Sequence, residues 1–69
     1  MEELDWDLIG TVGRISVPIS GDRSGEVLLP VRGGTEAFEA CADQPIAKNT
    51  KVVVVDCLSG RTVTVTPVP

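Results

Sequence analysis

The chain has 69 residues, 42% of them hydrophobic, which is enough for one compact domain but not for two. Six lysine and arginine residues stand against ten aspartate and glutamate residues, and the resulting net charge of −4 opposes binding to phosphate polyanions. The absence of histidine, with a single Trp and a single Phe, disfavours most enzymes, transition-metal sites and base-stacking surfaces.

The first seven residues form an acidic segment, which we predict to be a tether or tail in front of the domain. They carry four carboxylates and no basic residue, so they do not resemble a signal peptide. No stretch of the chain approaches the ~20 apolar residues of a membrane-spanning helix. Trp6 is either a plug for one end of a small barrel or an anchor at a membrane interface. We favour the plug, because the neighbouring carboxylates would be repelled by anionic lipid.

The first predicted strand covers residues 8–19. Apolar and small residues recur there at every second position, which places one set on an inward face: Ile9, Thr11, Gly13, Ile15, Val17 and Ile19. Gly10 and Gly13 inside the segment predict a sharp bend or a β-bulge. Pro18 has no N–H group to donate, so we expect this end of the strand to lie at an edge or beyond the pairing.

A turn at residues 20–24 precedes the second predicted strand, and a hairpin turn at residues 32–35 separates it from the third. In the second strand, residues 25–32, the inward set is Val27, Leu29 and Val31, with Pro30 on the opposite face. The Gly33-Gly34 pair is expected to accept the positive φ angles of a tight hairpin turn. In the third strand, residues 35–42, the inward set is Phe38, Ala40 and Ala42, and Cys41 is expected to be half covered.

Residues 43–49 link the third strand to the fourth, and this segment is too short for a helix and contains Pro45. Asn49 is a candidate for left-handed backbone, which Asn tolerates better than other non-glycine residues. The fourth strand, residues 51–57, contains four consecutive valines. The fifth strand alternates over residues 62–66, with Val63 and Val65 inward and three threonines outward: Thr62, Thr64 and Thr66.

Five short strands without helical periodicity predict an all-β protein. An open sheet of this length would leave one apolar face in water, whereas closure covers that face and removes most strand edges. We therefore predict one domain over residues 8–67, followed by a tail at residues 68–69. Its fold is a five-stranded, closed or nearly closed barrel similar to the oligonucleotide/oligosaccharide-binding (OB) fold, with no helix between strands three and four. The predicted core is Ile15, Val17, Val27, Leu29, Phe38, Ala40, Val52, Val54, Val63 and Val65.

The two cysteines are Cys41 and Cys57. The residues alone leave three roles open: a disulfide, two buried thiols that act as small hydrophobes, or reactive thiols. Buried thiols are the expectation, because unpaired cysteine is enriched in protein cores. With no histidine and no Cys-x-x-Cys spacing, the pair cannot complete a zinc site unless carboxylates or a second chain contribute. No carboxylate pair, calcium loop, serine elbow or phosphate-binding loop is recognisable, so we expect no catalytic residue, metal or cofactor.

Several short motifs together resemble the soluble C-terminal domain of NfeD-like proteins. The opening Leu8-Ile9-Gly10, with Gly13 three residues on, is similar to the start of that domain. Gly25-Glu26-Val27 is similar to the start of its second strand, and Phe38-Glu39-Ala40 to its aromatic-x-Ala motif, where Trp is common. Residues 45–52 resemble its link into strand four, with Asn49 where the family usually has Gly, and residues 58–67 resemble its closing strand.

The resemblance spans residues 8–67 and implies an OB-fold barrel at the C-terminus of a membrane protein whose transmembrane helices precede it. Family members are commonly encoded beside stomatin- or flotillin-type (SPFH) membrane proteins, and are thought to act with them in membrane organisation or quality control. The implied function is a non-enzymatic adaptor on a soluble domain, with an SPFH protein as its partner. Thiols in place of a disulfide would favour the cytoplasmic side of the membrane.

An oligonucleotide-binding module is the alternative function for such a barrel. It requires basic side chains beside aromatic ones on the second and third strands, and only Arg32 and Phe38 fall there, so we expect no nucleic-acid partner. The candidate interaction face consists of Arg32 and the outward residues Thr62, Thr64 and Thr66, since a short terminal strand can add to a partner's sheet. A third role for the barrel is only to oligomerise or to rigidify a membrane protein, and the domain would then form a homo-oligomer in the first case.

Overall fold

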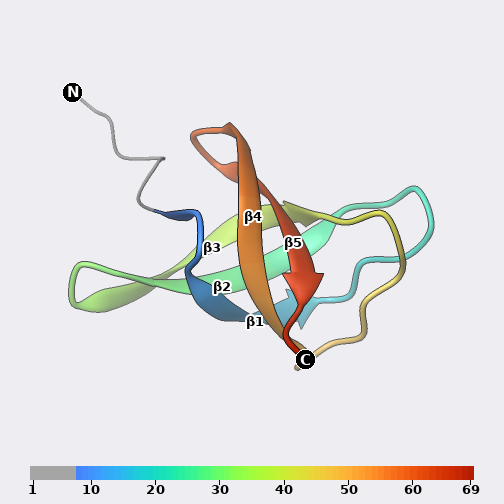
Figure 1. Cartoon of the computed structure of the whole chain (residues 1–69), viewed down its shortest axis with the longest axis horizontal. Coiled ribbons are helices and arrows are strands. Elements are labelled where there is room, and N and C mark those ends of the chain that lie inside the picture. The colour runs from blue at the N-terminus through green and yellow to red at the C-terminus, as the bar shows by residue number, and fades with distance from the viewer. Residues whose placement is uncertain (1–7) are drawn as a thin grey trace.

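The computed structural model describes residues 8–69, and these form five strands that close into a barrel (Figure 1). The strands are β1 (Val12–Val17), β2 (Gly25–Val31), β3 (Gly34–Cys41), β4 (Lys51–Ser59) and β5 (Thr62–Pro67). Their order around the barrel is β1-β2-β3-β5-β4, and β4 returns to pair with β1. All pairs are antiparallel except β3–β5, which is parallel. The predicted all-β, five-stranded barrel is confirmed, and no helix connects β3 to β4.

The two ends of the chain differ in what the structure describes. The predicted acidic tether at residues 1–7, with Trp6, lies outside the described residues. At the other end, the Val68 N–H donates to the carbonyl oxygen of Lys51 at 2.9 Å, so the last residues stay attached to β4. Residues 8–69 include no helix long and apolar enough to cross a membrane.

The barrel interior is filled by twelve buried apolar side chains, and no polar or charged side chain is buried within residues 8–69. All predicted core residues belong to this cluster except Val17, and three further residues join them: Leu8, Ile19 and Ile46. Small closed barrels of this kind are filled by their own side chains rather than by a ligand. The surface that this domain offers to another molecule is therefore its outer wall.

The first strand is shorter than predicted. β1 begins at Val12, because the chain makes a turn just before it, in which the Thr11 N–H donates to the carbonyl oxygen of Leu8 at 2.9 Å. Gly10 supports this turn with a φ of 93°, an angle that glycine adopts without strain. Ile9 consequently lies outside the barrel and is exposed, contrary to its predicted place on the inward face.

A β-bulge in β1 explains the one wrong core prediction. The register with β2 shifts between Ile15 and Val17, and such a bulge interrupts strict alternation along a strand. Val17 is therefore 48% exposed instead of buried. Ile19 returns to the interior, where its N–H donates to the carbonyl oxygen of Ile46 at 2.9 Å.

Two glycines allow β1 and β2 to approach each other closely. A Cβ atom on Gly25 would collide with the carbonyl oxygen of Val17 and lie 2.6 Å from that of Pro18. A Cβ atom on Gly13 would collide with the carbonyl oxygen of Leu28. Glycine at such positions marks a close backbone approach, and here it allows the two strands to pack directly against each other. We call this contact between β1 and β2 the seam.

The β2–β3 hairpin projects from the barrel and ends in a tight turn (Figure 1). The two turn residues with positive φ are Arg32, at 40°, and Gly33, at 79°, as in the favoured type I′ hairpin turn. The predicted Gly33-Gly34 pair is thus shifted by one residue, because Gly34 already belongs to β3. Asn49 has a φ of 72°, which confirms its predicted left-handed backbone.

The β4–β5 hairpin completes the wall. β4 is longer than predicted and continues to Ser59, and its valine run alternates so that Val52 and Val54 are buried. Its register with β5 shifts between Val54 and Asp56, and again between Cys57 and Ser59. After the first shift, Cys57 is partly buried and packs against the core.

Candidate functional site

The predicted threonine row lies on a strand with neighbours on both sides. β5 pairs with β4 along its length and with β3 at Glu39–Cys41. Thr62 and Thr64 are half-buried, and Thr66 is exposed. Where β3 meets it, β5 therefore has no open edge for a partner's strand, and the use of this row as an interaction face stays a prediction.

The hydroxyl of Thr62 is engaged within the wall by Glu39. The Glu39 carboxylate accepts a hydrogen bond from Ser24 Oγ at 2.6 Å and another from Thr62 Oγ1 at 3.2 Å. These two bonds, with that from Ser24 the larger influence, lower the pKa of Glu39 because they favour its charged form. Glu39 thus links the β1–β2 loop to β3 and β5.

Arg32 is not brought together with the threonine row. It lies in the β2–β3 turn, directly before β3 begins at Gly34. Thr62 and Thr64 pair with Glu39 and Cys41, at the other end of β3. The four predicted interaction residues therefore do not form one face.

Arg61, in the β4–β5 turn, covers part of the β3 surface instead. Its guanidinium forms a 3.3 Å ion pair with Glu36 and donates to the carbonyl oxygen of Ala37 at 3.1 Å. It also lies 5.1 Å from the centroid of the Phe38 ring, which is buried. Residues 8–69 therefore present no exposed aromatic ring on which a base could stack, and this disfavours the oligonucleotide-binding alternative.

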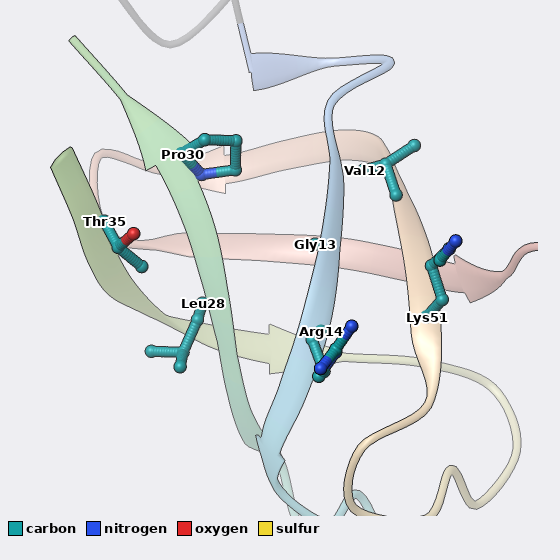
Figure 2. Close-up of a pocket in the computed structure, with 7 residues that line it drawn as sticks. All are labelled: Val12, Gly13, Arg14, Leu28, Pro30, Thr35 and Lys51. Carbon is teal, nitrogen blue, oxygen red and sulfur yellow. The ribbon is translucent and has the colours of Figure 1, made fainter. Parts of the chain in front are cut away.

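A groove of about 230 Å³ lies on the outer wall over β1, and we call it the outer groove (Figure 2). Its lining residues come from four strands: Val12, Gly13, Arg14, Leu28, Pro30, Thr35 and Lys51. In Figure 2, Leu28 and Pro30 of β2 lie on one flank and Lys51 of β4 on the other, with Gly13 and Arg14 of β1 between them. Val12 and Leu28 are 45% and 38% exposed, although both are large apolar residues.

A second hollow of about 310 Å³ lies beside the loop that joins β1 to β2 and includes Cys41 in its lining. Cys41 is half-buried, as predicted, and both Cys41 and Cys57 are thiols rather than members of a disulfide. Within residues 8–69, no group of three or more His, Cys, Asp or Glu side chains is placed to hold a metal ion.

Sequence reasoning did not identify the outer groove. Its two cations, Arg14 and Lys51, are distant in the chain and become neighbours only because β4 closes the barrel against β1. A partial signal was nevertheless present, since Val12, Leu28 and Pro30 are apolar residues on the outward phase of their strands, where polar residues are usual.

The strand order, the single parallel pair between β3 and β5, and the direct β3–β4 link together define a small OB-type barrel. The chain belongs to the NfeD C-terminal domain family, to which residues 12–66 match. The resemblance inferred from the sequence motifs is thereby confirmed.

Two solved structures illustrate how similar the chain is to known members. It is 35% identical to the soluble domain of the NfeD protein YuaF from Bacillus subtilis, over 88% of this chain and 74% of that one, with a TM-score of 0.76. It is 26% identical to the C-terminal domain of stomatin operon partner protein 1510-C from Pyrococcus horikoshii, over 99% of this chain and 98% of that one, with a TM-score of 0.75. No curated protein sequence matches the chain.

Proposed function

We propose that this domain is a non-catalytic adaptor, through which the membrane protein that carries it binds a stomatin- or flotillin-type (SPFH) membrane protein. In this role it contributes to membrane organisation or quality control by holding two proteins together, not by chemistry. On this proposal the domain lies on the cytoplasmic side of the membrane, where its two cysteines stay reduced.

The observation that carries the proposal is the similarity, over 99% of this chain, to the C-terminal domain of a stomatin operon partner protein. That similarity covers the whole barrel, so it concerns the same domain and not a shared fragment. The family assignment over residues 12–66 supports the same role.

The physical arrangement of the barrel also supports an adaptor. Its interior is occupied by apolar side chains, so a partner must be recognised on the wall. The wall carries the outer groove, in which exposed apolar side chains lie beside cationic ones. Protein interfaces combine an apolar centre with a polar rim in the same way.

The test is a direct binding measurement between the immobilised domain and a purified SPFH protein from the same organism. We expect saturable binding, and none to an unrelated OB barrel of similar net charge immobilised in parallel. Failure of both a stomatin-type and a flotillin-type protein to bind would overturn the proposal. In the same format, short single-stranded oligonucleotides at low salt should give no binding, because the domain is acidic.

A further inference from the structure

Three apolar side chains form an exposed strip in the outer groove: Val12, Leu28 and Pro30. They come from β1 and β2, and Figure 2 shows them around the same hollow. Each lies on the outward side of its strand, so none of them belongs to the core. Apolar side chains that gather in one exposed place are typical of binding sites, whereas single ones need no explanation.

Two cations lie directly beside this strip. Arg14 on β1 and Lys51 on β4 are register partners in an antiparallel pair, and both are exposed and line the groove. Like charges at directly opposite positions destabilise a sheet, because their Cβ atoms are only about 5 Å apart. In a chain with a net charge of −4, folding alone does not explain why two cations are placed together.

No carboxylate among residues 8–69 neutralises this pair. The one ion pair formed within those residues joins Arg61 to Glu36. Glu26, the carboxylate of β2, instead accepts a hydrogen bond from Ser16 Oγ at 2.7 Å. Within residues 8–69, the charges of Arg14 and Lys51 therefore have no ion-pair partner.

We propose that the outer groove binds an extended segment of a partner protein that carries an acidic side chain next to apolar ones. The partner's carboxylate lies between Arg14 and Lys51, where charge-assisted hydrogen bonds hold it. Its apolar neighbours cover the strip formed by Val12, Leu28 and Pro30. Binding thus removes two unfavourable features at once, the facing cations and the exposed strip. This inference rests on the proposed adaptor function and specifies the chemistry of its contact.

Anionic lipid would also be attracted by two cations, but the charge of the whole domain favours a peptide. A membrane surface meets the field of the entire domain, which carries a net charge of −4. A single peptide segment meets only the groove and its local positive charge. The hollow has a volume of only about 230 Å³, which suits a few side chains rather than an array of headgroups.

The test uses the 69-residue chain and a fluorescein-labelled synthetic peptide in which Glu alternates with Val. The same peptide with Lys in place of Glu is the control ligand. We expect the Glu peptide alone to bind, as measured by fluorescence anisotropy, and to shift the amide NMR signals of the strands that line the groove.

Two matched double variants then locate the site. Arg14→Glu combined with Lys51→Glu should weaken binding at least about tenfold, as expected for losing one charge-assisted hydrogen bond or more. Arg23→Glu combined with Lys48→Glu makes the same charge change at exposed residues outside the groove and should retain the binding. An equal loss of peptide affinity in both double variants would indicate long-range electrostatic attraction only, and would overturn the assignment of the binding site to the groove.

Three further outcomes separate this inference from the proposed function. If an SPFH protein binds the Arg14→Glu/Lys51→Glu variant as well as the unaltered domain, the adaptor function stands and the groove is not its contact. If phosphatidylserine vesicles bind more tightly than the Glu peptide, and this variant abolishes that binding, the groove serves lipid and the peptide proposal is overturned. If the SPFH protein fails to bind at all while the peptide binds the groove, only the partner assignment fails.

Discussion

The interior of the barrel and the outer groove share strands β1 and β2, but their apolar residues differ in exposure to water. On the inward side, Ile15, Val27 and Leu29 are completely buried among other apolar side chains. On the outward side of those strands, Val12 and Leu28 leave much of their apolar surface in water. Burial explains the first set, because it stabilises the fold, but it does not explain the second. The exposed apolar residues of the outer groove therefore need an explanation other than folding, and a binding role supplies one.

The largest expected effect tests the interior. Phe38→Ala should destabilise the domain by about 3–5 kcal/mol, because it empties a packed position in the core. It also removes the ring over which the Arg61 guanidinium lies. Chemical denaturation measures the loss, which is comparable to the total stability expected of so small a domain.

The control for this variant is Val17→Ala, at the position that the β-bulge turns outward. Its effect should stay within about 0.5 kcal/mol, as is usual for exposed sites. A cost for Val17→Ala similar to that of Phe38→Ala would mean that the interior extends further along β1 than the structure indicates.

The second largest effect is expected where β1 and β2 approach each other closely, in the wall between the interior and the outer groove. Gly25→Ala would place a Cβ atom against the backbone of Val17 and Pro18, and no flexible side chain there can move aside. We expect a loss of about 1–3 kcal/mol, as for other overpacked sites. Gly60→Ala is the matched control, since a Cβ atom there would meet nothing within 4 Å. Equal unfolding midpoints for the two variants in urea would contradict this account of the seam.

Sequence reasoning succeeded for the interior because burial leaves a periodic trace. The alternation through Val27 and Leu29, and through Val63 and Val65, identified both the strands and their inward faces. It failed where a local backbone feature breaks the period. The bulge before Val17 depends on how β1 fits against β2, and no residue type in the segment fixes its position.

The outer groove was much less predictable than the core. Arg14 and Lys51 become register partners only through barrel closure, which is a property of the complete fold. The candidate face that sequence did suggest combined Arg32 with the threonines of β5, but these residues lie at opposite ends of β3. Outward residues of a single strand can be recognised from period two, whereas the neighbours of that strand cannot.

A third prediction tests whether the groove reduces stability. Lys51→Glu should stabilise the domain by about 0.5 kcal/mol relative to Lys48→Glu, because it converts the facing cations into an opposite-charge pair with Arg14. Both variants change the net charge equally, so long-range effects cancel in the comparison. Urea denaturation at low salt measures the difference, which should shrink at high salt. A less stable Lys51→Glu variant would mean that Lys51 makes favourable contacts within the fold.

The smallest expected effect concerns a polar contact on the outer wall, at Glu39. Its pKa is lowered in the folded state, chiefly by the hydrogen bond from Ser24 and then by that from Thr62. The stability that it contributes is therefore fully present above the unfolded-state pKa, about 4.3 for glutamate, and is lost as the pH falls through the lower folded-state pKa.

Glu39→Gln should accordingly be less stable than the unaltered domain at neutral pH, and the two should converge once the pH is below the lowered folded-state pKa of Glu39, where the carboxyl is protonated in both states. Urea midpoints over this range measure the difference, and the other carboxylates contribute equally to both proteins. Ser24→Ala should remove most of the same pH dependence, because it removes the stronger donor. Parallel pH profiles for Glu39→Gln and the unaltered domain would show that these bonds contribute nothing, and that the wall, unlike the interior, adds no stability at this point.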